Sequence, residues 1–262
     1  MSDLMPTVIA TRFDKVMGSG RTRPCFLACE DGEGNEMELL VKLTGCPEMQ
    51  PFKLLCEAFS ALLAQDLDLP VPQPYRVEVT QGFAATVAQT EYRPFLVGSV
   101  GWNFGLAKWE PGTTLWPRDK TLNKAMRPTA GEILAFDAII QNPDRRASNP
   151  NCAFLGNDFV IFDHESAFSQ FLTIFPSNPW DAEALKFLND HVFRRVLNGG
   201  GLDLNRLQGA LEAITKERLD AYIAAIPAGW QSSTFSPTGI RDYLLECIDK
   251  FDTIKTQLEV LL

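Results

Sequence analysis

The segment Gln141–Phe168, QNPDRRASNPNCAFLGNDFVIFDHESAF, decides how the rest of the chain is interpreted. Asp144 is followed by Asn149 five residues later, and by Asp163 fourteen residues after that. Two apolar runs, CAFL and FVIF, stand between Asn149 and Asp163 and are separated by Gly-Asn-Asp. This pattern is typical of a tight β-hairpin. Because a hairpin returns the chain to its start, we expect Asp163 to lie close to Asn149, with Asp144 just before it.

Phosphoryl transfer from ATP needs side chains of these types. One carboxylate accepts the proton of the acceptor hydroxyl, and an Asn and a second Asp hold the Mg²⁺ ions that neutralise the phosphates. Protein kinases place four residues between their catalytic-loop Asp and Asn, which is the spacing of Asp144 and Asn149. Asp163 follows at the end of the expected hairpin, as the metal-binding Asp does in kinases. The alternative is a simple turn, because Asn, Asp and Pro favour turns.

The composition is that of a soluble globular protein. The chain has 262 residues, of which 45% are hydrophobic and 22% are charged, enough for one large domain or two lobes. No apolar run approaches a membrane span, and the first residues lack the pattern of a secretory signal. The net charge of −9 argues against general binding to nucleic acid or anionic membranes, but not against a local basic pocket for ATP. We therefore expect a cytoplasmic protein.

The cysteines do not form a recognisable metal or disulfide pattern. Six cysteines are scattered along the chain without a CxxC pair, and the only histidines are His164 and His191. A structural zinc site and a disulfide framework are both unexpected in such a chain. We interpret the cysteines as reduced thiols, most of them in the core.

The N-terminal part carries a candidate phosphate-binding region. The pattern of Val16–Lys42 predicts a small β-sheet, with Lys42 inside its last apolar run. A strand lysine either faces solvent or binds an anion, and in kinases it grips the α- and β-phosphates. Gly18–Thr22, just before the sheet's first apolar run, has two glycines that would let backbone N–H groups approach phosphate oxygens. A flexible hairpin turn explains these residues equally well.

A helix is predicted over Pro51–Gln65, where apolar residues recur at helical spacing. Glu57 is the acid best placed to hold Lys42, as a helix glutamate does in kinases. It projects nearly opposite the apolar stripe, however, so an ordinary solvated glutamate is an equal alternative.

The middle of the chain reads as strands and a connector. Leu67–Tyr75 contains three prolines and predicts an extended connector. Arg76–Ala88 predicts one or two strands, and Phe95–Val97 a further strand. The glycine-rich segment that follows, up to Gly112, suits a hinge between two lobes.

From about Pro117 the pattern is helical. Thr129 and Glu132 fit a capping box that begins a helix ending at Asn142, which would deliver Asp144. Asp137 inside this helix either braces the following loop or faces solvent. Further helices are expected over Asp181–Leu197, Leu204–Ile214, Lys216–Ile226 and, with a Ser-Pro start, Ser236–Leu262.

Taken in order along Gly18–Phe168, four features resemble the HipA-like kinases. They are SGRTRP before a strand, an internal strand lysine, the loop AIIQNPDRR followed by Asn149, and IFDHESAF. These kinases are bacterial kinase-fold proteins whose named member is a serine/threonine kinase toxin. The resemblance implies an α+β, two-lobed protein-kinase-like fold. Residues 1–110 would form a small β-rich N-lobe with one main helix, and residues 111–262 a helical C-lobe with the catalytic loop and hairpin.

The resemblance also implies roles for the candidate residues. Asp144 would be the catalytic base, and Asn149 and Asp163 the ligands of Mg²⁺. Lys42 would clamp the phosphates of ATP, held by Glu57. The loop over the phosphates would consist of Gly18, Ser19, Gly20, Arg21 and Thr22.

Two departures distinguish the chain from ordinary protein kinases. Asn142 stands two residues before Asp144 where those kinases have His, and Asp163 is followed by His164-Glu165 rather than Phe-Gly. The expected activity is ATP- and Mg²⁺-dependent phosphorylation of a Ser or Thr hydroxyl on a protein. The alternatives are a small-molecule kinase or AMP transferase of the same fold, and a non-catalytic nucleotide-binding module.

The expected partner is a protein substrate, and a regulatory or antitoxin-like partner is left open. Neither nucleic acid nor a membrane is expected as a partner. Ser19 and Thr22 raise a further hypothesis, self-phosphorylation of the loop, because a phosphate there would repel ATP.

Overall fold

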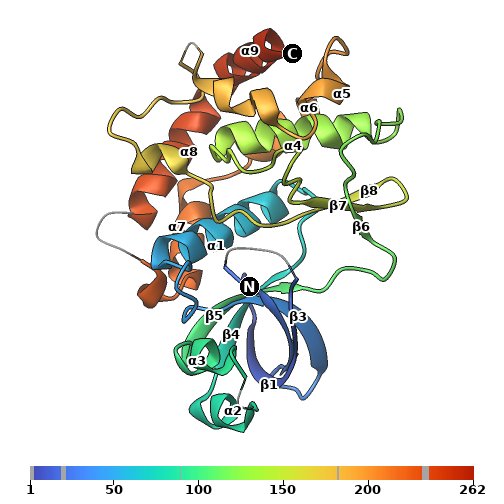
Figure 1. Cartoon of the computed structure of the whole chain (residues 1–262). Helices are drawn as coiled ribbons and strands as arrows, with labels where there is room; N and C mark the ends of the chain where they lie inside the picture. The colour runs from blue at the N-terminus through green and yellow to red at the C-terminus, as the bar shows by residue number, and fades with distance from the viewer. Residues whose placement is uncertain (1–2, 19–21, 89, 182, 232–235) are drawn as a thin grey trace.

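A computed structural model describes residues 3–18, 22–88, 90–181, 183–231 and 236–262 of the chain. Strands dominate the sequence up to residue 107, and helices dominate it from residue 127 onward. Figure 1 shows the strands of residues 7–107 gathered at one end of the molecule and most helices at the other. The prediction of a mixed α+β fold with a strand-rich N-terminal region is confirmed.

The N-terminal strands form a closed barrel with the order β1-β2-β3-β5-β4. The strands are β1 (Thr7–Val16), β2 (Cys25–Glu30), β3 (Glu36–Lys42), β4 (Pro74–Val79) and β5 (Gly101–Ala107). Neighbours are antiparallel except β1 and β4, which are parallel. The expected sheet over Val16–Lys42 is present, but it extends to β1, whose alternating start Val8-Ile9-Ala10 was not recognised. Because β1 pairs with β4, the sheet closes on itself and neither strand is an open edge.

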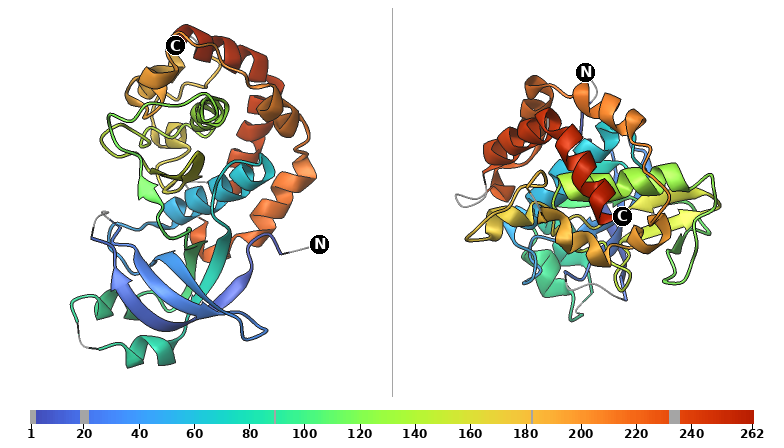
Figure 2. Two further views of the ribbon diagram at one scale, coloured as in Figure 1. Left: turned by 90° about the vertical axis from the view of Figure 1, so that its right-hand side faces the viewer. Right: turned by 90° about the horizontal axis from the view of Figure 1, so that it is seen from above.

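Helix α1 (Pro51–Asp66) confirms the helix expected over Pro51–Gln65 and begins with a proline at its first position. Every residue from Leu54 to Ala64 is buried, including Glu57 and Ser60. Since residues on every face of α1 are buried, other parts of the chain cover it on all sides. In Figure 2, left, α1 lies between the barrel and most of the helices that follow residue 127.

Two of the expected strands are helices. Within Arg76–Ala88 only Arg76–Val79 belongs to β4. Gln81–Thr86 forms α2, whose first turn is capped by Thr80 accepting from the backbone N–H of Phe83 at 3.1 Å. Phe95–Val97 lies in α3 (Arg93–Val97). Its proline near the N-terminus favours a helix start, and short apolar runs do not separate strand from helix by periodicity.

The hairpin predicted between Asn149 and Asp163 is confirmed. Strands β7 (Cys152–Leu155) and β8 (Asp158–Ile161) pair antiparallel, and β6 (Thr114–Leu115) adds a third strand beside β7. Gly156 in the turn has a φ of 61°, which a glycine adopts at little cost.

Helix α4 (Arg127–Ile139) starts three residues before the expected position, after an N-terminal cap residue, Met126. The capping box at Thr129 was therefore wrong. Glu132 instead accepts hydrogen bonds from the guanidinium of Arg206, with the Nε distance at 2.8 Å. Glu132 therefore pairs with Arg206, which is distant in sequence, and not with the expected capping-box partner, Thr129.

The C-terminal helices differ from the expected ones in two places. The region Asp181–Leu197 forms a 3₁₀ helix, Ala184–Asp190, and a short α5 (Arg194–Leu197). The last expected helix is broken at Lys250 into α8 (Pro237–Asp249) and α9 (Phe251–Leu261), and Ser236 caps α8 as the Ser-Pro start indicates. The expected helices between them are present as α6 (Asn205–Glu212) and α7 (Lys216–Ala225). Two more 3₁₀ helices are Ser169–Leu172 and Ala228–Trp230.

The six cysteines are free and buried, as expected from their scattered positions. Within the described ranges, no helix has the length and apolar character needed to cross a membrane.

Candidate active site

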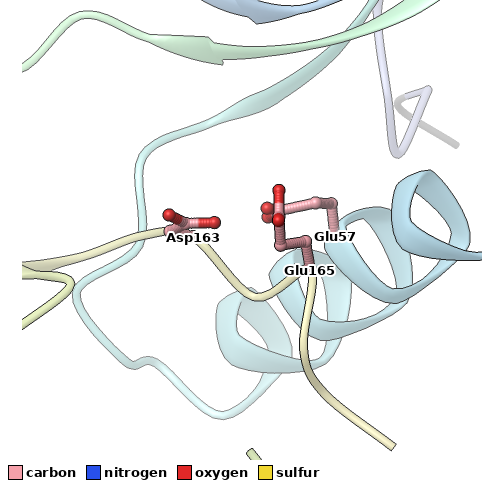
Figure 3. A group of neighbouring side chains, drawn as sticks. All are labelled: Glu57, Asp163 and Glu165. Atoms are coloured by element: carbon pink, nitrogen blue, oxygen red, sulfur yellow. The ribbon is translucent and has the colours of Figure 1, made fainter. Parts of the chain in front are cut away.

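Lys42, at the end of β3, is surrounded by three carboxylates from two other parts of the chain. Its side chain is almost completely buried, and its Nζ donates to Glu57 of α1 and to Asp163 after β8. Glu165 accepts a third hydrogen bond at 2.9 Å. Figure 3 shows the carboxyl groups of Glu57, Asp163 and Glu165 gathered in one place. The structure thus brings Lys42 to Glu57, and Asp163 to both of them.

The charges of this cluster perturb one another. Burial raises the pKa of Glu57 to about 7, although Lys42 opposes the shift. Burial would also raise the pKa of Asp163, but nearby Lys42 outweighs it and lowers that pKa. The pKa of Lys42 is raised well above its ordinary value because its carboxylate neighbours outweigh the effect of burial. Three acids around one ammonium leave an excess of negative charge that a cation would neutralise.

The carboxylates of Glu57, Asp163 and Glu165 fit a divalent cation. One oxygen from each lies within 4.8 Å of the others. Oxygen ligands of this kind suit Mg²⁺. Glu165 also accepts from the Thr22 hydroxyl at 3.2 Å and from Lys53 at 3.3 Å. The sequence identified Glu165 only as a departure from Phe-Gly, and its place two residues after Asp163 was the available signal.

Asp144 and Asn149 are in direct contact, as their spacing indicates. Asn149 Nδ2 donates to Asp144 Oδ2 at 2.9 Å, and Asn151 Nδ2 donates to the same oxygen at 3.2 Å. Arg146 pairs with the other oxygen, Oδ1, at 2.9 Å. Both carboxylate oxygens are therefore positioned by neighbours on the same loop, and the side chain remains partly exposed.

A buried ionic cluster around Asp137 of α4 holds the loop that carries Asp144. Asp137 of α4 accepts from Arg145 Nε at 2.6 Å and from Asn142 Nδ2 at 3.1 Å, and His191 Nε2 lies 3.0 Å from it. Burial would raise the pKa of Asp137, but Arg145 and His191 outweigh it and lower the pKa to about 2. Of the two interpretations of Asp137, the structure shows the one in which it braces the loop.

Arg145 and His191 were not recognised from the sequence. Arg145 is fully buried between Asp137 and the backbone carbonyl of Asn151, so it ties α4 to the far end of the loop. The adjacent Asp144-Arg145 pair was a local signal for the arginine. His191 is 47 residues beyond Asp144, and no local pattern indicated its position.

His164 fixes the backbone next to Asp163. Its ring is fully buried edge-to-face against Phe136, with centroids 5.8 Å apart, and burial lowers its pKa to about 3. Its backbone N–H donates to Glu57 Oε2 at 3.0 Å. Asp163 itself has a φ of 61°, a conformation that costs a non-glycine residue roughly 1–2 kcal/mol. The buried neutral ring beside it helps to hold this conformation.

A cavity of about 230 Å³ lies beside the cluster. Its walls are mainly apolar, while Lys42, Asn149 and Asp163 contribute polar groups. The apolar lining includes Leu40, Phe104, Leu106, Trp109, Leu115, Ala153 and Phe162. Trp109, within the glycine-rich segment expected as a hinge, stacks on Phe162 with ring centroids 4.9 Å apart. The cavity suits a flat apolar ring joined to an anionic group.

The expected phosphate loop is described only in part. Thr22 lines the cavity, and Gly18 has open space around its α-carbon. Ser19, Gly20 and Arg21 lie outside the described residues. Asp144 is connected to the cavity through Asn149, which lines it and donates to the Asp144 carboxylate.

Comparisons with known proteins agree with this geometry. A family model described as HipA-like kinase matches residues 10–255. Among solved structures, the chain is similar to the crystal structure of CtkA, a proinflammatory kinase of Helicobacter pylori, with a TM-score of 0.52 and 13% identity. The similarity covers 97% of this chain and 99% of that chain, and at this identity it shows a shared fold alone. A comparison with curated proteins gave no match.

Proposed function

The chain belongs to the HipA-like kinase family, and we propose that it transfers the γ-phosphoryl group of ATP to a Ser or Thr hydroxyl of a protein. The observation that carries this proposal is the meeting of Lys42, Asn149 and Asp163 at one cavity, with Asp144 bonded to Asn149. In this proposal residues 1–110 and 111–262 are the two lobes of a protein-kinase-like fold, and ATP binds between them.

In this proposal the cavity holds the adenine ring, and the phosphates lie beside Lys42. Its apolar walls, including Leu40 and Ala153, would enclose the adenine ring. Lys42 would grip the α- and β-phosphates, and Glu57 would orient its ammonium group. The segment Gly18–Thr22, which comprises Gly18, Ser19, Gly20, Arg21 and Thr22, would cover the phosphates with backbone N–H groups.

Asn149 and Asp163 would hold Mg²⁺, with Glu165 as a further carboxylate close to Asp163. Bound Mg²⁺ would neutralise the charge on the β- and γ-phosphates. Three carboxylates contact Lys42, and the phosphate oxygens of ATP would replace part of these contacts.

Asp144 would act as the base. The acceptor hydroxyl oxygen forms a bond to the γ-phosphorus while the bond from that phosphorus to the β,γ-bridging oxygen breaks, and ADP leaves. The hydroxyl proton passes to the Asp144 carboxylate, which Asn149 and Asn151 orient. The residues that follow Asp144, from Arg146 to Ser148, are exposed, so a hydroxyl on a protein surface can approach the base.

The substitution Asp144→Asn tests this role. We expect transfer to a protein substrate to fall by about 100-fold or more, the usual contribution of a general base, while the ATP-induced rise in thermal stability persists. Asp158→Asn makes the same charge change on the exposed start of β8 and serves as the control. Undiminished transfer by Asp144→Asn would contradict the assignment of the base.

Labelled nucleotide distinguishes the alternative reactions of the same fold. With γ-labelled ATP the acceptor gains label only if phosphate is transferred, and with α-labelled ATP only if AMP is transferred. We expect label from γ-labelled ATP on protein and none on small molecules. ATP binding without turnover would instead support the non-catalytic nucleotide-binding module.

We also place the protein in the cytoplasm. The support is that all six cysteines are free and buried, which suits a reducing compartment. A protein substrate and a regulatory or antitoxin-like protein are the partners compatible with this placement.

A further inference from the structure

The loop that carries Asp144 borders two separate hollows. Asn149, Pro150 and Asn151 line the cavity proposed for ATP, whereas Arg146, Ala147 and Ser148 line a second hollow of about 440 Å³. The residues that line the two hollows are otherwise different. A molecule in the second hollow would therefore lie across the Asp144 loop from the nucleotide.

The second hollow, which we call the arginine groove, is strongly basic. Four arginines line it, from three different segments of the chain: Arg118, Arg146, Arg194 and Arg195. Asp190 is the acid among its lining residues. In a chain whose net charge is −9, four guanidinium groups and one carboxylate make a local positive region. Figure 1 shows α5, which carries two of the arginines, near the segment between β6 and α4 that carries Arg118.

Three of these arginines, Arg118, Arg146 and Arg195, are exposed, whereas Arg194 is half-buried and its Nη2 donates to the carbonyl of Leu261 at 3.0 Å. Arg145, by contrast, is completely buried against Asp137. The side chain of Arg195 is 72% exposed, and its nearest acid, Asp119, is 3.9 Å away. Arg118 is exposed and has no ion pair within the described part of the chain. A ligand can therefore reach the guanidinium groups of the three exposed arginines.

Arg146 links the arginine groove to the reaction. Its guanidinium pairs with Oδ1 of Asp144, and its side chain is 48% exposed. An anion bound by Arg146 would compete for this ion pair and leave Oδ1 free to accept a proton. The same contact would hold the anion's neighbouring hydroxyl close to the base, which favours reaction by orientation.

Resting on the proposed function, we propose that the arginine groove selects the acceptor: a Ser or Thr flanked by anionic residues. Guanidinium groups bind carboxylates and phosphates through two parallel hydrogen bonds, so either acidic residues or phosphorylated residues could supply the anion. The acidic remainder of the surface would repel such a segment and direct it to the groove.

Peptides with one serine and identical length test the selectivity. The flanking residues are Asp and Glu, Asn and Gln, Lys and Arg, or phosphoserine, and transfer from γ-labelled ATP is measured as kcat/KM. We expect the anionic peptides to exceed the neutral ones by about tenfold, with the advantage shrinking as salt screens the charges. The Asp/Glu and phosphoserine arms identify which source of anion the groove prefers.

The double substitution Arg118→Glu with Arg195→Glu should abolish the advantage of the anionic peptides. Arg12→Glu is the matched control, because Arg12 is also an exposed arginine next to an aspartate, Asp14, but lies on β1. The advantage should persist in this control. An ATP-induced thermal shift equal to that of the wild type shows that each variant is folded with an intact nucleotide site.

The possible failures are distinguishable. If the wild type phosphorylates neutral or basic peptides as well as anionic ones, or if the double variant keeps the advantage, the inference is wrong and the kinase function stands. If the protein binds ATP but phosphorylates no peptide of any class, the proposed function fails and the inference fails with it.

Discussion

Among single residues, Lys42 shows how a buried charge is maintained. Alone at the end of β3, an ammonium group at 5% exposure would lose its hydration at high cost. Three carboxylates compensate for that cost, and one of them, Glu57, has its own pKa raised to about 7 by burial. The cluster is therefore stable only as a set, and removing Lys42, the cation that contacts all three carboxylates, exposes the repulsion among the acids.

We expect Lys42→Met to lower the free energy of unfolding by about 3 kcal/mol, because it leaves Glu57 buried without its cation. It should also abolish the thermal shift caused by ATP and Mg²⁺. Calorimetry with and without nucleotide measures both effects. Lys53→Met is the control, since Lys53 also reaches Glu165, at 3.3 Å, but is more exposed. Equal ATP affinity in Lys42→Met and the wild type would refute the phosphate-clamp role.

The lowered pKa of Asp137 makes the stability of the fold depend on pH. Its pKa is about 2 in the folded protein against an ordinary 3.8, so the unfolded state binds its proton first as the pH falls. The resulting stabilisation, on the order of 2 kcal/mol, is complete above about pH 4 and is lost as the pH falls toward 2. Asp137→Asn should be destabilised at neutral pH by about 3–5 kcal/mol, because Arg145 is left buried and unpaired.

Denaturant unfolding of the wild type and of Asp137→Asn, from neutral to acid pH, measures how the stability of each depends on pH. The stability difference between wild type and Asp137→Asn should narrow as the pH falls below 4. A difference that stays constant or widens in acid would show that the carboxylate charge of Asp137 does not stabilise the fold. Asp158→Asn, an exposed acid on β8, should show neither effect.

Among the helices and strands, the β7–β8 hairpin and α4 position the residues of the site. The hairpin places Asp163 back beside the loop, with Asn151 accepting at its carbonyl from the N–H of Phe162 at 3.2 Å. Helix α4 supplies the buried Asp137 under the same loop. Neither element makes the site alone, but each fixes one end of a loop whose residues would otherwise sample many conformations.

The hairpin turn can be tested through its glycine. Gly156→Ala should destabilise the protein by about 1 kcal/mol, because φ is 61° there and alanine avoids that conformation. Gly209→Ala should instead stabilise it by roughly 0.5–1 kcal/mol, since Gly209 lies in α6 with open space around it. Thermal unfolding of the pair checks the opposite signs. Stabilisation by Gly156→Ala would show that the turn relaxes away from the left-handed conformation.

Across the whole molecule, the barrel and the helices share one core. The buried helix α1 contacts β4 and β5 on the barrel side and α7 on the other. Asp66 at its end accepts from Arg218 of α7 at 2.5 Å, and Trp230 donates to the carbonyl of Trp102 in β5 at 3.2 Å. These contacts join residues far apart in the sequence, so we expect the chain to unfold as one unit.

Trp230→Ala tests this coupling. Trp230 is buried with its ring edge-to-face against Phe104, and its loss should cost about 3–5 kcal/mol. Far-UV circular dichroism and aromatic fluorescence should report a single coincident transition in both proteins. Trp180→Ala, which removes a contact with Tyr243 within the helical part, provides the comparison. Two separate transitions in the wild type would show that the parts fold independently.

Residue spacing over short stretches of the sequence predicts several parts of the fold and of the site. The hairpin, α1 and the contact of Asp144 with Asn149 follow from residue spacing within a few tens of residues, and these are confirmed. The short apolar run at Phe95–Val97 predicts a strand but forms α3, because periodicity over five residues does not distinguish a strand from a helix.

Residue spacing alone indicates the kinase-like order of lysine, glutamate, Asp-x-x-x-x-Asn and aspartate, since these spacings are local or depend on a hairpin. Three features are visible only in the folded chain: Glu57 points into the core, Glu165 contacts Lys42 across 123 residues, and His191 contacts Asp137 across 54 residues. Burial and contacts of this range depend on how whole elements pack. No single segment encodes them, because each requires partners that are close only after the chain has folded.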